Sequence, residues 1–164
     1  ACLPNLHVLV RPNDLRCAIE PELDNCEMPP CNMRDMLICD IAVYVLAFSN
    51  VIQTDLVDVR LERVSHDACW KFHRDCVEAR FLRTYRGPGT EWVLPIYADR
   101  ALSDQTSFNG PVEHIDLQEG VLFKGNSAGP GIGIVHRSPP IVGTGQTRML
   151  LCLNQPSVTS PPPY

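Results

Sequence analysis

The apolar positions of the chain recur with a helical period in one early stretch. From Asn32 onwards they follow one another at spacings of three and four, and Asp35 falls in the first turn, which favours a helix capped by Asn32. We expect this helix to pack its apolar face on a sheet. That face comprises Met33, Leu37, Ile41, Tyr44, Val45 and Phe48.

After Asn50 the period changes to two. Val57, Val59 and Leu61 alternate with charged residues, as in a half-buried strand. Turn-forming stretches rich in Gly, Pro and Asn separate most of the later strand candidates. Many short strands after a single helix predict a mainly β fold, either an antiparallel barrel or a cupin-like jelly roll. The candidates are Lys71–Asp75, Val77–Arg86, Glu91–Pro95, His114–Leu117, Gly120–Lys124, Gly131–His136 and Arg148–Leu153.

The length of 164 residues fits a single domain with one core. Residues 1–31 are rich in Pro and Cys, and we expect an irregular segment there apart from an edge strand at Leu6–Val10. Residues 32–155 form the predicted domain with its leading helix. The proline-rich tail, residues 156–164, is expected to be extended and poorly ordered.

Net charge and cysteine usage limit the expected partners and the expected cellular compartment of the protein. A net charge of −5 argues against a nucleic-acid or anionic-membrane partner, and we expect no run to be apolar for long enough to span a membrane. The N-terminus shows no charged-then-apolar signal pattern. Cys39 and Cys152 lie in apolar patterns typical of buried thiols, which favours reduced cysteines and a cytoplasmic protein.

The basic residues are distributed unevenly along this acidic chain. Residues 60–100 contain eight of the 14 Lys and Arg side chains. Most of them are expected to form cross-strand ion pairs. Some of them are candidates to face an anionic ligand.

An H-x-D pair is the first candidate for chemistry. If His73 and Asp75 lie on a strand, the period of two puts both side chains on one face. One further His from a facing strand would complete a 2-His-1-carboxylate group, which leaves coordination positions open and suits non-haem Fe(II). His136, in GIGIVHRSPP, is the candidate for that third ligand.

The order of the motifs adds a resemblance. His73-x-Asp75 is followed by a strand ending in Thr84-Tyr85, a G-P-G-T-E-W turn, Q-E-G-V-L-F and then H-R-S-P-P-I-V-G-T-G-Q-T-R. Over about residues 55–155 this order resembles the Fe(II)/2-oxoglutarate-dependent dioxygenases of the prolyl-hydroxylase type. The central string also resembles an uncharacterised bacterial family with the hallmark C-x-x-F-H-x-D, then T-Y-x-G-x-G-T-x-W.

The dioxygenase resemblance implies a double-stranded β-helix fold and an oxygenase that hydroxylates an unknown small-molecule or peptide substrate. It assigns Fe(II) to His73, Asp75 and His136, which would be the catalytic residues. Arg148 would bind the distal carboxylate of 2-oxoglutarate, with Tyr85 or Thr84 giving a hydroxyl partner. A Y-x-N cosubstrate signature is not evident before the G-P-G-T turn.

Two alternatives remain. A non-catalytic protein of the same fold could bind zinc or another metal, with Cys69 as an extra ligand, because thiolate favours zinc over iron. A barrel without metal could instead bind a small anion through its arginines.

Overall fold

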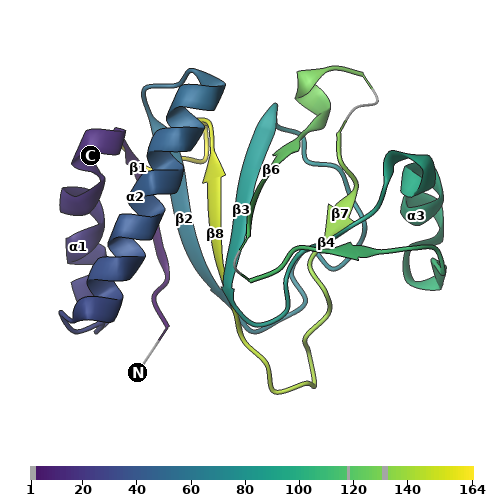
Figure 1. Cartoon of the computed structure of the whole chain (residues 1–164), viewed down its shortest axis with the longest axis horizontal. Helices are drawn as coiled ribbons and strands as arrows, with labels where there is room; N and C mark the ends of the chain where they lie inside the picture. Colours follow the sequence, from purple (N-terminus) through teal and green to yellow (C-terminus); the bar gives the residue numbers. More distant parts are fainter. Residues whose placement is uncertain (1–2, 118, 131–132) are drawn as a thin grey trace. The chain divides into compact units, whose positions relative to one another are not determined.

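The computed structural model describes residues 3–117, 119–130 and 133–164 (Figure 1). The chain divides into two compact units. The first comprises Ala1–Arg63 and Leu151–Tyr164, and the second comprises Val64–Leu150.

The first unit combines two helices with antiparallel strands. Strand β1 (Leu6–Val10) pairs with β2 (Val57–Val64), with Val8 opposite Val59. Strand β8 (Arg148–Asn154) belongs to both units, because the boundary between them falls after Leu150. Helix α1 (Leu15–Asn25), which follows the short helix η1 (Pro12–Asp14), contacts both β1 and α2 (Asn32–Ile52).

Helix α2 was predicted from the sequence, and its bounds agree with the pattern. It buries Leu37, Ile41 and Phe48 at helical spacing, and it ends at Gln53, whose φ of 56° is left-handed. Cys31, not Asn32, occupies the cap position, and its side chain makes no capping hydrogen bond. Met33, expected on the buried face, is 72% exposed.

The sequence analysis expected no run to be apolar for long enough to span a membrane, and by length and composition this expectation is wrong. Helix α2 is long and apolar enough to cross a membrane by length and composition alone. The core helix of a soluble protein passes the same test, so this finding is weak evidence for a membrane span.

Helix α1 was not predicted. It lies in residues 1–31, which the sequence analysis expected to be irregular apart from β1. Its buried residues Leu15, Ala18, Ile19 and Leu23 have helical spacing, but the helix is short and contains Pro21, which lacks an amide hydrogen for the helical ladder. Packing of this apolar face supplies the stability that the local sequence does not.

The proline-rich tail is held against the first unit rather than left loose. Pro163 bridges to Leu9 of β1, and the amide of Tyr164 donates to the carbonyl of Leu9 at 2.9 Å. The hydroxyl of Ser160 donates to Asp58, a carboxylate on β2 that is only 1% exposed.

The second unit contains the candidate chemistry. Strand β3 (Ala79–Arg86) pairs antiparallel with β6 (Gly120–Lys124), with Phe81 opposite Leu122. A separate three-stranded sheet has the order β5-β4-β7. Its strands are two residues each: β4 (Glu91–Trp92), β5 (Glu113–His114) and β7 (His136–Arg137). Between β4 and β5 the chain forms η2 (Pro95–Tyr97), α3 (Ala98–Asp104) and η3 (Gln105–Ser107), and η4 (Asn126–Ala128) follows β6.

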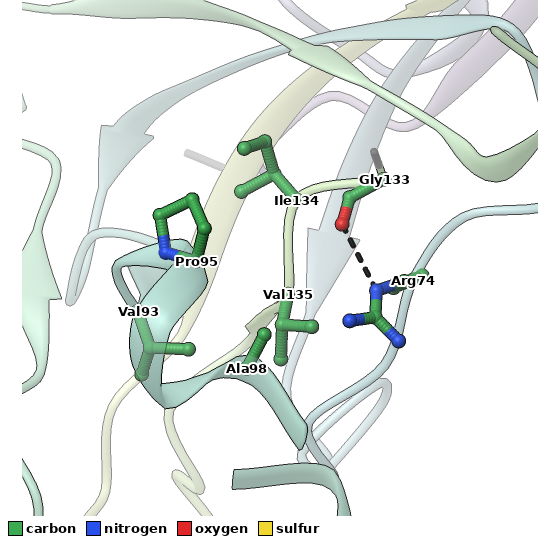
Figure 2. Close-up of a pocket in the computed structure, with 7 residues that line it drawn as sticks. All are labelled: Arg74, Val93, Pro95, Ala98, Gly133, Ile134 and Val135. Atoms are coloured by element: carbon green, nitrogen blue, oxygen red, sulfur yellow. Dashed lines mark hydrogen bonds between the residues drawn. The ribbon is translucent and has the colours of Figure 1, made fainter. Parts of the chain in front are cut away.

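A small apolar core supports this second unit. Phe72, Val93, Ala98, Ala101 and Val135 form a buried cluster. Beside it lies a cavity of about 110 Å³ (Figure 2). Its lining consists of Arg74, Val93, Pro95, Ala98, Gly133, Ile134 and Val135.

The predicted mainly β jelly roll, a cupin-like double-stranded β-helix, is wrong. The structure is mixed α/β, with 32% helix and 26% strand in two antiparallel sheets, and its described residues show no clear jelly roll. Helices α1 and α3 account for part of the difference, because both lie in segments that the sequence pattern left without helix. The expected strand at Lys71–Asp75 reduces to one bridging residue, His73, and residues 131–132 of the expected strand Gly131–His136 lie outside the described residues.

Candidate metal site

Backbone pairing brings the two candidate histidines together. His73 and His136 form an antiparallel bridge in which each amide donates to the other's carbonyl, at 3.0 and 3.1 Å. Residues opposite each other in such a pair project to the same face. Their imidazole centroids are accordingly 4.6 Å apart.

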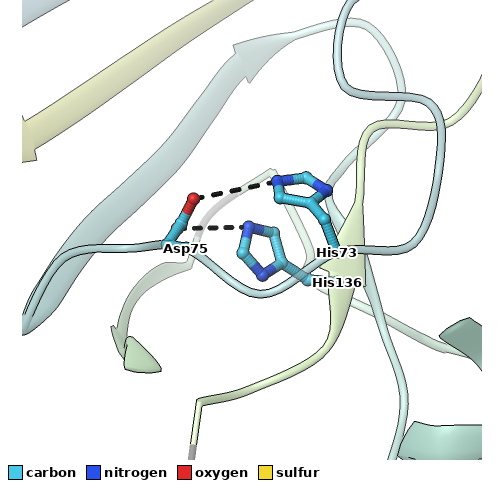
Figure 3. A group of neighbouring side chains, drawn as sticks. All are labelled: His73, Asp75 and His136. Atoms are coloured by element: carbon cyan, nitrogen blue, oxygen red, sulfur yellow. Dashed lines mark ion pairs between the residues drawn. The ribbon is translucent and has the colours of Figure 1, made fainter. Parts of the chain in front are cut away.

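Asp75 lies two residues beyond His73, and its carboxylate reaches both rings (Figure 3). Its Oδ1 is 3.7 Å from Nε2 of His73, and its Oδ2 is 3.4 Å from Nε2 of His136. One potential ligand atom from each of the three residues lies within 4.8 Å of the other two, so the group could hold a metal ion. The intervening Arg74 and the neighbouring Val135 line the cavity of Figure 2, on the opposite faces of their segments.

The hydrogen bonds of the rings define which nitrogen faces the carboxylate. Nδ1 of His73 lies 2.8 Å from the carbonyl of Lys71, and Nδ1 of His136 lies 3.1 Å from that of Ile134. A carbonyl only accepts, so we assign a proton to each Nδ1. In a neutral ring Nε2 then carries a bare lone pair, which is the arrangement that metal-binding histidines share.

Burial favours this neutral form for His136. The side chain is 5% exposed, and burial lowers the pKa of His136, although the nearby Asp75 acts in the opposite direction. A lone pair on Nε2 facing a carboxylate oxygen is unfavourable unless a proton or a metal cation lies between them.

Asp75 itself has one satisfied and one unsatisfied oxygen. Arg80 donates to Oδ1 at 2.7 Å, which fixes the orientation of the carboxylate. Oδ2 is buried and has no hydrogen-bond partner among the described residues. Buried polar atoms without partners are rare in folded proteins, and a bound cation would satisfy this oxygen. The donor set therefore fits a cation bound by two imidazole nitrogens and Oδ2 of Asp75.

Arg148 is a buried cation a short distance along the same face. It is 1% exposed, and its guanidinium donates to the carbonyl of Pro88 at 2.8 Å and to the hydroxyl of Ser138 at 2.5 Å. It also donates to the hydroxyls of Thr84 and Thr90, at 3.4 and 3.2 Å. All of these partners are neutral, and burial lowers the pKa of Arg148.

Backbone geometry links Arg148 to the histidines. Ser138 lies two residues after His136, and in an extended segment such residues share a face at a separation of roughly 7 Å. Gly87 has a φ of 81°, and a Cβ there would lie 3.0 Å from Cγ of Arg148. The glycine thus allows the turn before β4 to approach the arginine closely.

Of the remaining predicted residues, the structure brings Thr84 to Arg148 but brings neither Tyr85 nor Cys69 to the site. Thr84 joins Arg148 through its hydroxyl. Tyr85 follows it on β3, so its side chain points to the other face of the strand, where the guanidinium of Arg83 lies 5.1 Å from its ring centre. Cys69 is exposed and is not part of the group formed by His73, Asp75 and His136.

Sequence reasoning missed Arg80, Ser138 and Thr90. No periodicity pointed to Arg80, because it contacts Asp75 from beyond an irregular loop. Ser138 and Thr90 were considered only as parts of motifs. A signal for both exists, because Ser138 lies two residues after His136 and Thr90 lies two residues before Trp92, and His136 and Trp92 are cross-strand partners.

The expected thiol burial is correct for one residue only. Cys152 is buried, whereas Cys39 is exposed. The seven cysteines in the described part of the chain form no disulfide bond, and Cys2 lies outside it.

The fold and this site define a mixed α/β protein with a candidate 2-His-1-carboxylate metal group. The chain belongs to the family described as "Protein of unknown function (DUF1826)", whose model matches residues 1–154. The predicted membership of an uncharacterised family is thereby confirmed, while the hallmark motif and the resemblance to dioxygenases stay predictions. No curated protein and no solved structure matches the chain.

Proposed function

We propose that this protein is an Fe(II)/2-oxoglutarate-dependent oxygenase that hydroxylates its substrate. The observation that carries the proposal is the arrangement at Asp75. Two rings with protonated Nδ1 atoms direct Nε2 toward a buried carboxylate, and one oxygen of that carboxylate lacks a donor.

The donor set supports iron as the resident metal. His73, Asp75 and His136 would hold it, and a group of two imidazoles and one carboxylate with open positions is typical of non-haem Fe(II) oxygenases. When bound, Fe(II) would supply the redox chemistry that activates O2. Arg80 keeps Asp75 in its orientation, and burial lowers the pKa of His136, which favours its neutral form.

The surroundings of Arg148 support an anionic cosubstrate. A buried guanidinium is costly unless a negative charge accompanies it, and its present partners are neutral carbonyl and hydroxyl groups. A carboxylate could take two parallel hydrogen bonds from its fork, with Ser138 and Thr84 as further donors. This is the role of the distal carboxylate of 2-oxoglutarate in the proposal.

The overall reaction balances with one molecule of O2. One oxygen atom enters the substrate C–H bond to give an alcohol, and the other enters the new carboxylate of succinate. The bond between C1 and C2 of 2-oxoglutarate breaks, and C1 leaves as CO2. The two electrons lost at the 2-oxo acid and the two lost at the substrate together reduce O2.

One observation favours a second candidate, a metal-binding protein without oxygenase activity. Arg148 is 1% exposed and already has four polar partners, so its guanidinium does not require a carboxylate to satisfy its hydrogen bonds. In this alternative the same three ligands bind zinc or another metal, and Arg148 is structural.

Calorimetry of 2-oxoglutarate binding to the anaerobic, Fe(II)-loaded protein separates the two. We expect binding by the wild type, and a loss of roughly tenfold to a hundredfold in Arg148→Lys, which keeps the charge but not the planar fork. Arg86→Lys, an exposed substitution on the same strand as Thr84, should bind like the wild type.

Metal content measured on the same samples shows that Arg148→Lys still folds. Absence of 2-oxoglutarate binding in a metal-loaded wild type would reject the oxygenase and leave the metal-binding alternative. Equal binding by wild type and Arg148→Lys would reject Arg148 as the anchor.

A further inference from the structure

A groove lies beside the candidate metal group in the second unit. Its volume is about 640 Å³, within the range of roughly 300–1,000 Å³ typical of ligand sites. Strands β4 and β5 supply Trp92 and Glu113, and Ile115 directly follows β5. Strand β6 supplies Phe123, and Glu119 directly precedes it.

Strand geometry shows that this groove follows the face that bears His136. Trp92 is the direct cross-strand partner of His136, and Ile134, which also lines the groove, precedes His136 by two residues. All three side chains therefore project to one face. The ring of Phe123 lies 4.9 Å from that of His136 and 6.4 Å from that of Trp92.

Three residues at intervals of two, Ile134, His136 and Ser138, thus lie on the same face and belong to three different sites. Ile134 lies in the groove, His136 in the metal group, and Ser138 against Arg148. The groove and the Arg148 cluster consequently lie on opposite sides of the metal group along this segment. This order leaves the groove free for a substrate when Arg148 binds a cosubstrate.

The charges of the groove select the kind of substrate. Glu113 and Glu119 are exposed and line it, and the described lining residues include no Lys or Arg. The lining residue His114 has its Nδ1 3.9 Å from the carboxylate of Glu91. Two aromatic rings complete the walls, and aromatic faces attract cations.

We infer that this groove binds an organic cation, an alkylammonium or guanidinium group on an apolar stem, as the substrate of the metal group. The apolar stem would pack on Trp92 and Phe123, and the cationic head would lie toward Glu113 and Glu119. This inference rests on the proposed oxygenase function for its chemical step, but binding in the groove requires no turnover. The cation belongs either to a free amine or to a basic side chain of a peptide.

Matched probes test the charge preference by calorimetry on the anaerobic, Fe(II)-loaded protein. Phenethylammonium, 2-phenylethanol and 3-phenylpropionate share an aromatic stem and differ in charge. We expect phenethylammonium to bind on the order of tenfold more tightly than the neutral alcohol and the anion to bind least. The peptides acetyl-Ala-Lys-Ala-amide and acetyl-Ala-Gln-Ala-amide provide the second source of the cation.

Substitutions then locate the effect in the groove. The double variant Glu113→Gln/Glu119→Gln should retain its metal and lose the preference for the cation. Asp116→Asn is the control. Asp116 is an exposed acidic residue near Glu113 and Glu119 in the sequence, but it does not line the groove. Removing its negative charge should leave the preference for the cation unchanged. A Lys-over-Gln preference identifies a peptide substrate, and a preference confined to phenethylammonium identifies a free amine.

The outcomes separate the two proposals. Equal affinity for the three phenyl probes, tighter binding of the anion, or no binding of any cationic probe overturns the inference. A preference that survives in the double variant also overturns it. Absence of stoichiometric metal in the wild type instead rejects the proposed function, and repeating the titration on that metal-free protein still decides the charge preference.

Discussion

The imidazole of His136 has two nitrogens with different roles. Nδ1 faces a backbone carbonyl, and Nε2 faces Asp75. His73 repeats this division, so two rings from separate segments direct equivalent atoms to one carboxylate. Their orientation is determined by backbone hydrogen bonds, so the protein's own main chain holds both rings in place.

Removing either ring should remove the metal. We expect His73→Ala and His136→Ala each to lose stoichiometric Fe(II), with affinity falling by more than the roughly hundredfold that loss of an outer-shell partner can cost. His114→Ala, which changes an exposed His outside the group, should keep the wild-type content.

Metal analysis after purification without chelators measures the content, and circular dichroism shows whether each variant folds. If both folded variants carry as much metal as the wild type, His73 and His136 are not ligands.

At the scale of elements, the residues that directly follow β6 pack closely against the loop after Asp75 and support the position of its carboxylate. The amide of Gly125 donates to the backbone carbonyl of Glu78 at 2.8 Å, and the amide of Asn126 donates to that of Asp75 at 2.9 Å. A Cβ on Gly125 would lie 2.0 Å from the carbonyl oxygen of Val77 and 3.0 Å from that of Asp75. Only glycine fits between these backbones without displacement.

Gly125→Ala should therefore weaken both folding and metal binding. We expect a loss of about 1–3 kcal/mol in the free energy of unfolding, measured in urea, because the loop must move to admit the methyl group. Metal affinity should fall in parallel, since that loop carries Asp75.

Gly143→Ala is the matched control. Its Cβ would meet no heavy atom within 4 Å, so only its φ of 78° opposes the substitution, at a cost of roughly 1 kcal/mol. Its metal affinity should equal that of the wild type. A Gly125→Ala protein with unchanged metal affinity would show that this contact does not position Asp75.

Local signals account for which elements the sequence revealed. Periodicity identified α2 and the strands β1, β2, β3, β6 and β8, each of which is at least five residues long. The strand candidates at Glu91–Pro95, His114–Leu117 and Gly131–His136 overlap the two-residue strands β4, β5 and β7, but their bounds were wrong because the pairing of such short strands depends on contacts between distant segments. The grouping of His73, Asp75 and His136 was expected from residue types and strand period, whereas Arg80 became visible only through tertiary structure.

At the scale of the whole molecule, the tail and the strands of the first unit meet at one buried carboxylate. Asp58 accepts hydrogen bonds from Arg60 and Ser160, and its Oδ2 lies 3.0 Å from Nε2 of His7. Burial alone would raise the pKa of Asp58, but these hydrogen bonds outweigh burial and hold its pKa below the ordinary value. The ionised form thus stabilises the fold.

Asp58→Asn should consequently be less stable at pH 7. A pKa that is lower in the folded than in the unfolded state contributes stability above about pH 4, the ordinary range of aspartate, and that contribution disappears as the pH falls through the folded value. The difference in unfolding free energy between wild type and variant should therefore shrink on acidification. Loss of hydrogen bonds to a charged acceptor corresponds to about 1.5–3 kcal/mol at pH 7.

Urea titrations at several pH values measure this difference. Asp55→Asn, an exposed aspartate in the same unit, should change stability by less than about 0.5 kcal/mol. A constant difference between wild type and Asp58→Asn from pH 7 to pH 3 would contradict the role given to the ionised carboxylate.

The bridge between His73 and His136 has a consequence for the lifetime of the protein in a cell. In an unfolded chain His73 and Asp75 remain neighbours, but His136 leaves them, so only the folded second unit presents all three side chains. Under the proposed function, iron binds the folded form alone and reduces the fraction of time that this unit is open to proteases. Cells short of iron would then degrade the protein faster, and its abundance would follow the iron supply.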